Sequence, residues 1–367
     1  MKVLIISLRA GAGHVKAAEA LKKAFDKIAS KVETKVIDFL DYSTILSKKF
    51  YSDLYIDIVN KAPDLYAWLY KRITPTSTTF RLLFDRINAA KFKKYILEYQ
   101  PDVVIATHFV PANLLTFWRK TYKLKYKVGI VVTDYEAHCL WADKQADFYA
   151  VATKEVKKSL IKFGIDAEII KEIGIPIDLK FLKRYSKNKI YKKFGLKKKF
   201  TISIFSGGFG MGPIEKIFEN LNNLSEDFQL IVLAGKNKEL FSHLKKAAQR
   251  ETKKILIFGF VDNIEEVMAI SDIIITKAGG LTVTECLAMG VPLMISNPIS
   301  GQEEANSRYL LSHRAALRAD KSDEIKSLIK NIIKNKEILR KLRYNIKKIA
   351  KPRAALKIAE LIKEKWL

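Results

Sequence analysis

One stretch near the C-terminal end, residues 276–306, constrains this chain more than any other part of it. It follows three isoleucines at residues 273–275, which predict a buried strand. Gly279 and Gly280 come next, and because neither carries a Cβ the backbone can turn tightly there and approach a ligand. The expected order is therefore a strand, a glycine turn and a helix, whose first N–H groups and positive dipole end suit a phosphate.

This helix is expected over residues 281–289, because a glycine and a proline follow it. Glu285 lies one and a half turns into the helix, where a carboxylate can accept hydrogen bonds from both hydroxyls of a ribose. A second strand at 293–296 leads to Gln302 and Glu303, whose amide and carboxylate groups suit a sugar. A glycine pair alone more often marks only a tight turn, but the ordered set predicts a nucleotide-sugar site.

Length, charge and cysteine content limit the class of protein. At 367 residues the chain predicts two domains, each with its own core. The net charge of +27 predicts an anionic partner, but no helix-turn-helix, zinc or ribonucleoprotein motif is present, so nucleic acid is not expected. Two cysteines predict no disulfide framework, which fits a reducing cytosol. No apolar run has the length of a membrane span or of a signal peptide, so any membrane contact is expected to be peripheral.

Polar residues that follow expected strands are candidates for chemistry in the first half of the chain, His14 and Asp134 among them. A strand at 3–7 is followed by a glycine-rich turn and then by His14 at the start of a helix. His14 is either a general base with a pKa near neutral pH or a solvent-exposed or capping imidazole, and its position alone favours neither. Asp134 follows another expected strand, at 128–133, and lies at the sheet edge where ligands bind in α/β proteins.

Residues 42–95 depart from the alternation of strands and helices, because aromatic and basic residues crowd together there. Such a mixture on helices indicates equally a membrane-surface face or a helical pair with a core of aromatics and solvated lysines. Residues 74–79, with the sequence TPTSTT, are expected to form a flexible loop. The residues expected to contact the acceptor or the membrane are Trp68, Tyr70, Lys71, Arg72, Phe80, Arg81, Phe84 and Arg86.

The second half of the chain begins with an expected strand at 201–205 and a glycine-rich turn at 206–212. The spacing of these glycines differs from the dinucleotide-binding fingerprint, and no acidic residue follows where that fingerprint needs one. After a further strand at 255–258, Phe260 and Val261 are candidates for contact with a flat base.

Taken in order, these motifs resemble the family of monogalactosyldiacylglycerol synthases and bacterial processive diacylglycerol glucosyltransferases. More distantly, the chain is similar to the transferase that adds N-acetylglucosamine to lipid-linked peptidoglycan precursors. The resemblance covers essentially the full length, and it rests on residues 11–15 (GAGHV), 133–138 (TDYEAH), 153, 174–177 (GIPI), 207–212 (GGFGMG), 276–282 (TKAGGLT), 285 and 301–306 (GQEEAN).

The resemblance implies an α/β protein of the GT-B fold, with two Rossmann-like lobes whose parallel sheets face each other across a cleft. Residues 1–177 would form the acceptor and membrane-binding lobe, 178–199 a connection and 200–350 the lobe that binds the UDP-sugar. The C-terminal helix, within 351–367, would pack back on the first lobe.

The resemblance also implies a reaction: inverting transfer of a hexose from UDP-glucose or UDP-galactose to diacylglycerol or a glycosyl-diacylglycerol. No metal or other cofactor is expected. His14 or Asp134 would be the base, with the other assisting it. The residues expected to bind the donor are Gly13, Gly207, Gly208, Gly210, Met211, Phe260, Val261, Ala278, Gly279, Gly280, Thr282, Glu285, Gln302, Glu303 and Asn306. Plant members carry a glycine where this chain has Ala12, which leaves the choice of glucose or galactose open.

The resemblance implies that the protein acts at the inner face of the cell membrane, with anionic lipids as partners. The rival reactions are those of a UDP-sugar 2-epimerase, which resembles the same fold but needs no lipid surface, and transfer to another lipid-linked acceptor. The aromatic and basic content of residues 42–95 argues against the epimerase. A non-catalytic sensor of sugar nucleotides would have no need of His14.

Overall fold

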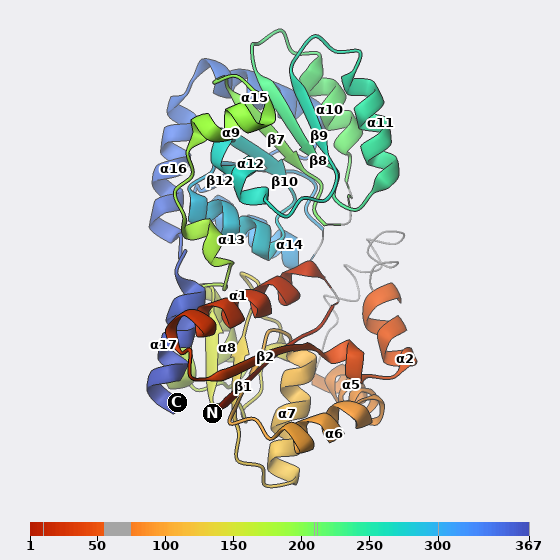
Figure 1. Cartoon of the computed structure of the whole chain (residues 1–367), viewed down its shortest axis with the longest axis vertical. Coiled ribbons are helices and arrows are strands. Elements are labelled where there is room, and N and C mark those ends of the chain that lie inside the picture. Colours follow the sequence, from red (N-terminus) through yellow and green to blue (C-terminus); the bar gives the residue numbers. More distant parts are fainter. Residues whose placement is uncertain (10, 55–74, 209, 211, 300, 367) are drawn as a thin grey trace. The chain divides into compact units, whose positions relative to one another are not determined.

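The computed structural model describes the chain except for residues 10, 55–74, 209, 211, 300 and 367, and the side chains of residues 52–54 and 75–80. The chain divides into two compact units (Figure 1). The first comprises Met1–Leu179, Ser300–Gln302 and Lys351–Leu367, and the second Lys180–Ile299 and Glu303–Ala350. Each unit has its own parallel sheet, which confirms the predicted two-lobed α/β fold.

The sheet of the first unit has six parallel strands in the order β2-β1-β3-β4-β5-β6. The inner strands β1, β3, β4 and β5 are near-continuous apolar runs, as expected of strands that helices cover on both faces, and Val3, Leu4, Ile5 and Ile6 are fully buried. The strands are β1 (Lys2–Ser7), β2 (Glu33–Asp38), β3 (Val103–Ala106), β4 (Lys127–Val131), β5 (Phe148–Val151) and β6 (Ile170–Glu172). The helices beside them are α1 (Ala12–Ile28), α6 (Ala90–Tyr99), α7 (Phe109–Thr121) and α8 (Lys154–Lys162).

The C-terminal helix α17 (Ala354–Trp366) belongs to this first unit, although its sequence follows the second one. It lies beside α1 (Figure 1), where the Lys363 ammonium donates a hydrogen bond of 3.0 Å to the carbonyl oxygen of Ile28. The Trp366 ring meets the Phe148 ring edge to face, with 6.1 Å between the centroids.

Two helical segments flank the part of the first unit that the structure leaves undescribed. On one side are α2 (Ile45–Lys48) and the π-helix η2 (Lys49–Leu54), and on the other is α5 (Pro75–Asn88). The expectation of a loop over residues 74–79 is therefore wrong for residues 75–79, which form the first turn of α5. Proline suits the first helical position, because its missing N–H would have no partner there.

The sheet of the second unit also has six parallel strands, in the order β12-β11-β10-β7-β8-β9. The strands are β7 (Thr201–Phe205), β8 (Gln229–Leu233), β9 (Ile255–Phe258), β10 (Ile273–Thr276), β11 (Leu293–Ile295) and β12 (Ala316–Arg318). The helices are α9 (Lys187–Phe194), α10 (Ile214–Asn222), α11 (Lys238–Ala248), α12 (Ile264–Ile270), α13 (Gly280–Met289), α14 (Gln302–Ser312), α15 (Ser322–Lys334) and α16 (Glu337–Ile349).

Helix α9 lies within residues 178–199, which the sequence presents as a connection. It packs against α12 in the second unit, where the Lys193 ammonium lies 2.6 Å from a carboxylate oxygen of Glu266. None of the helices in the described part of the chain combines the length and the apolar character that a membrane crossing requires.

Candidate functional site

The first half of the candidate site lies where the strand order of the first sheet reverses. Strand β1 pairs with β2 on one side and with β3 on the other, so the loops after β1 and β3 leave the sheet at a topological switch point. Ligands of open α/β sheets bind at this position, outside the carboxyl ends of the strands. The loop after β1 leads to His14 in the first turn of α1, and Thr107 directly follows β3.

His14 is held at this switch point by hydrogen bonds. Its Nδ1 atom lies 2.7 Å from the Thr107 carbonyl oxygen and 3.0 Å from the Thr133 hydroxyl oxygen. Because a carbonyl oxygen can only accept, Nδ1 carries the proton, and Nε2 is left as the acceptor nitrogen of the neutral ring. The Thr107 hydroxyl in turn donates a 2.9 Å hydrogen bond to the carbonyl oxygen of His14. The ends of β3 and β4 therefore set both the position and the tautomer of the imidazole.

The surroundings of His14 keep it uncharged. Burial lowers its pKa to about 4, and the hydrogen bond to Thr107 offsets only part of that effect. The His108 ring packs edge-on against it, with 4.7 Å between the centroids, and burial also lowers the pKa of His108. His108 has a structural role of its own, since its Nδ1 accepts a hydrogen bond from the Val110 N–H and caps α7. His14 is therefore available as a proton acceptor at neutral pH.

Asp134 and Gly13, also predicted for the site, lie on the same two loops. Asp134 is buried and directly follows Thr133, the residue whose hydroxyl contacts His14. Gly13 is half-buried in the first turn of α1, next to His14. The structure thus brings the residues predicted from residues 11–14 and 133–134 to one sheet edge.

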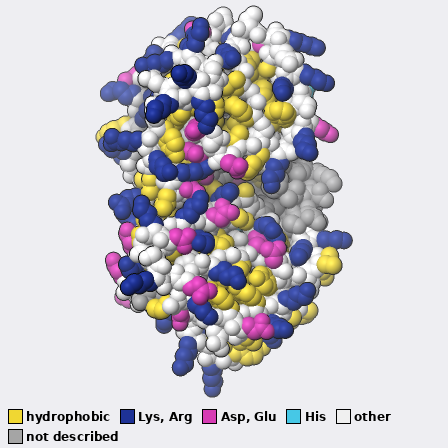
Figure 2. All heavy atoms as spheres, in the orientation of Figure 1, with side chains coloured by type: hydrophobic (Ala, Val, Ile, Leu, Met, Phe, Trp, Pro, Cys, Tyr) yellow, Lys and Arg dark blue, Asp and Glu magenta, His cyan; other side chains and the backbone are white. Residues whose placement is uncertain are grey.

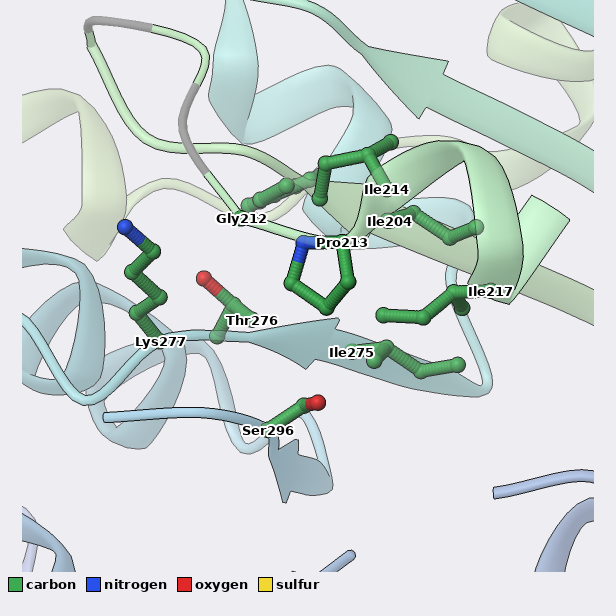
Figure 3. A pocket seen from close by; sticks show the side chains of 10 residues that line it. Ile204, Gly212, Pro213, Ile214, Ile217, Ile275, Thr276, Lys277 and Ser296 are labelled. Carbon is green, nitrogen blue, oxygen red and sulfur yellow. The ribbon is translucent and has the colours of Figure 1, made fainter. Parts of the chain in front are cut away.

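The second half of the candidate site lies at the switch point of the second sheet. Strand β7 pairs with β8 on one side and with β10 on the other, so the glycine-rich turn after β7 and the glycine pair after β10 leave the sheet side by side. A pocket lies beside them (Figure 3), lined by Gly212 and Pro213 at the end of the first turn and by Thr276 and Lys277 at the end of β10. Its apolar floor includes Ile204, Ile217 and Ile275, and Thr276, Lys277 and Ser296 line it with polar groups.

Asn306 fixes the turn that precedes α13. Its side chain is fully buried, and its Nδ2 donates a 2.9 Å hydrogen bond to the carbonyl oxygen of Ala278. Gly279 caps the helix without a side-chain hydrogen bond, and a Cβ added there would meet no atom within 4 Å. Open space therefore lies beside Gly279 at the start of α13, the end of a helix that favours a phosphate. Glu285 and Thr282, both half-buried, extend from this helix.

The glycines of the turn after β7 have different reasons to be glycine. A Cβ at Gly207 or Gly208 would meet no atom within 4 Å, so both border open space. A Cβ at Gly210, where φ is +70°, would lie 2.4 Å from the Ala234 carbonyl oxygen and from the Cβ of Asn237. Gly210 is therefore required for packing against the turn after β8, whatever its role toward a ligand. Met211 lies outside the described residues.

The remaining predicted donor residues lie on the loop that follows β9 and at the start of α14. Phe260 is 54% exposed, and the Lys236 ammonium lies 5.7 Å from the centre of its ring. Its neighbour Val261 is half-buried, as are Gln302 and Glu303 at the start of α14. A carboxylate oxygen of Glu303 accepts a 2.7 Å hydrogen bond from the Ile299 N–H, while burial raises the pKa of its carboxyl group.

The predicted membrane residues require a correction. Arg81 is mostly buried: its guanidinium donates hydrogen bonds to Asp85 at 3.0 Å and to Asn113 at 2.7 Å, and lies 5.0 Å from the centre of the Phe109 ring. Arg81 therefore stabilises the first unit and is not part of an exposed basic surface. The mixture of aromatic and basic residues in the sequence showed no sign of this structural role. The role depends on an acidic residue, Asp85, which lies one helical turn after Arg81 and pairs with it.

The other predicted membrane residues that the structure describes also pack inward. The Arg86 guanidinium stacks at 3.5 Å over the Phe117 ring, and Phe84 packs against the hydrophobic core. Trp68, Tyr70, Lys71 and Arg72 lie outside the described residues, as does the side chain of Phe80.

Three residues of the site were not singled out from the sequence. Thr107 and Thr133 end expected strands, so their position was a usable signal, but a backbone carbonyl or a hydroxyl that orients a histidine leaves no motif. Lys277 lies inside the motif at 276–282 and received no role, although the structure places it on the wall of the pocket.

Two family models match the chain, one for each unit's core. Residues 14–177 match the monogalactosyldiacylglycerol (MGDG) synthase model, and residues 201–364 match the glycosyltransferase family 28 C-terminal domain. A relative from Bacillus licheniformis, a processive diacylglycerol beta-glucosyltransferase, is 28% identical over 351 residues, which cover 95% of this chain and 90% of that protein. The predicted family resemblance is therefore confirmed.

Solved structures show the same fold. MurG from Acinetobacter baumannii superposes with a TM-score of 0.64 at 17% identity, covering 99% of this chain and 100% of MurG. A UDP-GlcNAc 2-epimerase from Neisseria meningitidis, bound to UDP-GlcNAc, superposes with a TM-score of 0.66 at 14% identity over the full length of both chains. At these identities the likeness concerns the fold alone. The two matched domains show that the chain is a glycosyltransferase, with an N-terminal domain of the MGDG synthase family and a C-terminal domain of glycosyltransferase family 28.

Proposed function

We propose that this chain transfers a hexose from a UDP-hexose to the free hydroxyl of diacylglycerol or of a glycosyl-diacylglycerol, at the surface of a membrane. The observation that carries the chemistry is the hydrogen bond between His14 Nδ1 and the Thr107 carbonyl oxygen, which leaves Nε2 as the proton acceptor. The lipid acceptor is supported by relatives that are named for it and that match this chain over nearly its full length. Because they are named glucosyltransferases, we take glucose as the sugar.

The proposed reaction is a single displacement at the anomeric carbon of the sugar. The Nε2 atom of His14 takes the proton of the acceptor hydroxyl, whose oxygen forms a new bond to that carbon. The bond from the carbon to the diphosphate oxygen breaks, its electron pair stays on UDP, and the configuration inverts. A positioned base of this kind typically contributes roughly 10²–10⁴-fold to the rate. Asp134, next to Thr133, assists by stabilising the imidazolium that forms.

The donor is proposed to bind at the switch point of the second unit. Open space at Gly207, Gly208 and Gly279 admits the diphosphate to the backbone N–H groups, and Glu285 accepts hydrogen bonds from the ribose. Gln302 and Glu303 contact the sugar. Fixed N–H groups and a helix dipole aimed at the departing UDP would stabilise the charge that grows on it.

This arrangement is proposed to work without a bound metal ion. In the part of the chain that the structure describes, no three histidine, cysteine or carboxylate groups are gathered as metal ligands would be. Assays of the purified chain with and without a chelator test the proposal. Full activity in the chelator is expected, and a loss that magnesium or manganese restores would contradict it.

The membrane face is proposed to be an exposed apolar surface on α2, η2 and α5. It consists of Ile45, Leu46, Phe50, Leu83 and Ile87, and we name it the α2/α5 surface. Ile45 is 75% and Ile87 69% exposed. Large exposed apolar patches on otherwise soluble domains mark sites of interaction with proteins or membranes.

Contacts between the two helical segments bring the residues of this surface close together. The backbone N–H of Thr44 donates a 3.2 Å hydrogen bond to the Asn88 carbonyl oxygen, so the start of α2 lies against the end of α5. Further along, the rings of Phe50 and Phe84 lie 5.4 Å apart, between centroids. The apolar residues would enter the lipid, while the exposed Lys49 and Lys91 face anionic headgroups.

Charge alone does not mark the membrane side. On the face that Figure 2 shows, lysine and arginine side chains are spread over both units and do not gather in one patch. Each basic residue near an anionic surface contributes roughly 1 kcal/mol. Electrostatic attraction would therefore strengthen the contact, and the apolar surface would orient it. We place this contact on the inner face of the cell membrane, where anionic lipids and UDP-sugars meet.

The function is tested by incubating the purified chain with diacylglycerol in anionic vesicles and UDP-glucose. Formation of glucosyl-diacylglycerol is the expected result. Turnover of the UDP-sugar without a lipid product would contradict the proposed acceptor.

A further inference from the structure

Lys277 contributes an ammonium group to the pocket of the second unit. Lys277 follows the last residue of β10 and is half-buried. Within the part of the chain that the structure describes, no hydrogen bond or ion pair joins its ammonium group to another residue. Burial lowers its pKa, and the charge of Glu303 opposes that effect only in part. A half-buried cation that lacks a hydrogen-bonded anion is unfavourable, and a bound anion would remove this cost.

The backbone around Lys277 adds further positive charge. Gly279 and Gly280 begin α13 two and three residues after the lysine, and neither a side-chain cap nor an acidic residue in the first turn neutralises that end of the helix. Cations are favoured at the C-terminus of a helix and disfavoured at the N-terminus. A lysine two residues before the N-cap residue of α13 therefore adds positive charge to the positive end of the helix, and an anion bound there would offset it.

The position of the side chain is determined by packing. A Cβ added to Gly212, where φ is +115°, would lie 3.3 Å from the Cε atom of Lys277, so the lysine stem passes over this glycine. In Figure 3 the ammonium points away from the apolar floor of the pocket, alongside the turn that contains Gly212. It therefore lies beside the glycine-rich turn after β7, at the carboxyl end of β10 and at the switch point of the sheet.

We infer that Lys277 binds the diphosphate of the nucleotide donor and neutralises the leaving group. This inference rests on the proposed function and assigns to one residue the charge compensation that a metal ion supplies in other transferases. As the bond between the anomeric carbon and the diphosphate oxygen breaks, the electron pair moves to that oxygen, and the ammonium stabilises the added charge. Lysine suits this task because it presents a compact point charge that can follow a phosphate.

Binding of UDP and of uridine to the full chain separates this role from others. Uridine has the base and the ribose but no phosphate. Lys277→Met, which keeps the apolar stem and removes the charge, is expected to weaken UDP binding by about 10- to 100-fold and to leave uridine binding unchanged. Lys277→Arg, which keeps a charge, is expected to retain most of the UDP affinity. Lys246→Met, on the exposed face of α11, is the matched control and should bind both ligands as the wild type does.

The other possible binding results contradict either this inference or the proposed function. Unchanged UDP affinity in Lys277→Met would overturn this inference while leaving the proposed function intact. An equal loss of UDP and uridine binding would mean that Lys277 only supports the fold of the pocket, and would also overturn it. A wild-type chain that binds neither ligand would contradict the proposed function itself. If Lys277→Met does not fold, as judged by its melting temperature, Lys277→Gln provides the same comparison.

Discussion

The Nδ1 atom of His14 lies 2.7 Å from the carbonyl oxygen of Thr107, and this contact joins the start of α1 to the end of β3. A backbone carbonyl cannot change its protonation state or rotate away, as a side chain can. The proton on Nδ1 is therefore kept in place by the sheet itself, and Nε2 remains the nitrogen that can accept a proton. This is the arrangement that a histidine base requires.

Replacing His14 should reduce turnover without changing donor affinity. His14→Ala removes the proton acceptor, so kcat is expected to fall by about 10²–10⁴-fold, while the Kd for UDP stays within twofold. Steady-state assays and calorimetry measure the two quantities. His243→Ala is the control, because that histidine is exposed on α11 and pairs with Glu215. Near-normal turnover in His14→Ala would transfer the role of base to Asp134.

The pH dependence should reflect the lowered pKa of His14. Its neutral form is the active one, and a pKa of about 4 keeps it neutral at higher pH. The acidic limb of kcat/KM is therefore expected well below the ordinary histidine value of about 6.5. In the unfolded chain His14 regains its ordinary pKa, so its contribution to stability is fully present above pH 6.5 and is lost as the pH falls toward 4.

Rates measured from pH 4.5 to 8, with melting temperatures at each pH, separate these two effects. A limb at pH 6.5 in a chain that is still folded would show that His14 is not shielded as the structure indicates.

Glu285 should affect every ligand that carries a ribose. Glu285→Ala removes the acceptor for the ribose hydroxyls, and losing a charged hydrogen-bonding group costs on the order of 1.5–3 kcal/mol. Calorimetry is expected to show weaker binding of both UDP and uridine, in contrast to Lys277→Met. Affinities equal to those of the wild type would mean that the ribose lies elsewhere.

The membrane contact should depend on the α2/α5 surface and on anionic lipid. Ile45→Ser combined with Ile87→Ser removes two exposed apolar side chains, so sedimentation with anionic vesicles is expected to fall severalfold, with UDP affinity unchanged. Each buried side chain of this size contributes roughly 1.5–3 kcal/mol when it leaves water. Added salt should also weaken binding, because charges are screened over about 8 Å at physiological ionic strength.

Ile161→Ser with Phe163→Ser, exposed at the end of α8, is the matched control and should sediment as the wild type does. Equal binding of the Ile45→Ser, Ile87→Ser variant and the wild type would place the membrane face elsewhere. Arg81→Ser is expected to lower the melting temperature, because it breaks the buried pair with Asp85.

Much of the fold was predictable because both sheets are parallel and buried. Runs such as residues 201–205 and 255–258 coincide with the observed strands β7 and β9, since such strands read as continuous apolar segments. Strand β12 was not predicted, because three residues, Ala316–Arg318, form too short a pattern. The first turn of α5 was mistaken for a loop, since threonine and serine at a helix start resemble a turn.

The location of the site was predictable from the sequence, but the separate roles of its residues in packing and in ligand binding were not. The sequence order of residues 276–306 identified the turn before α13, but Asn306 proved to be a buried support for Ala278. Gly210 likewise packs against the turn after β8. Sequence spacing does not reveal such packing roles, because they depend on which loops the sheet order brings together.

Product analysis tests the central claim most directly. The purified chain is incubated with diacylglycerol in anionic vesicles and, in separate reactions, with UDP-glucose, UDP-galactose and UDP-N-acetylglucosamine, and lipids and nucleotides are identified by mass spectrometry. The proposed function predicts a hexosyl-diacylglycerol and an equal amount of UDP, with UDP-glucose as the best donor. The His14→Ala chain is expected to form only a trace of product. An epimerised UDP-sugar with no glycolipid, or no turnover with any of the three donors, would contradict it.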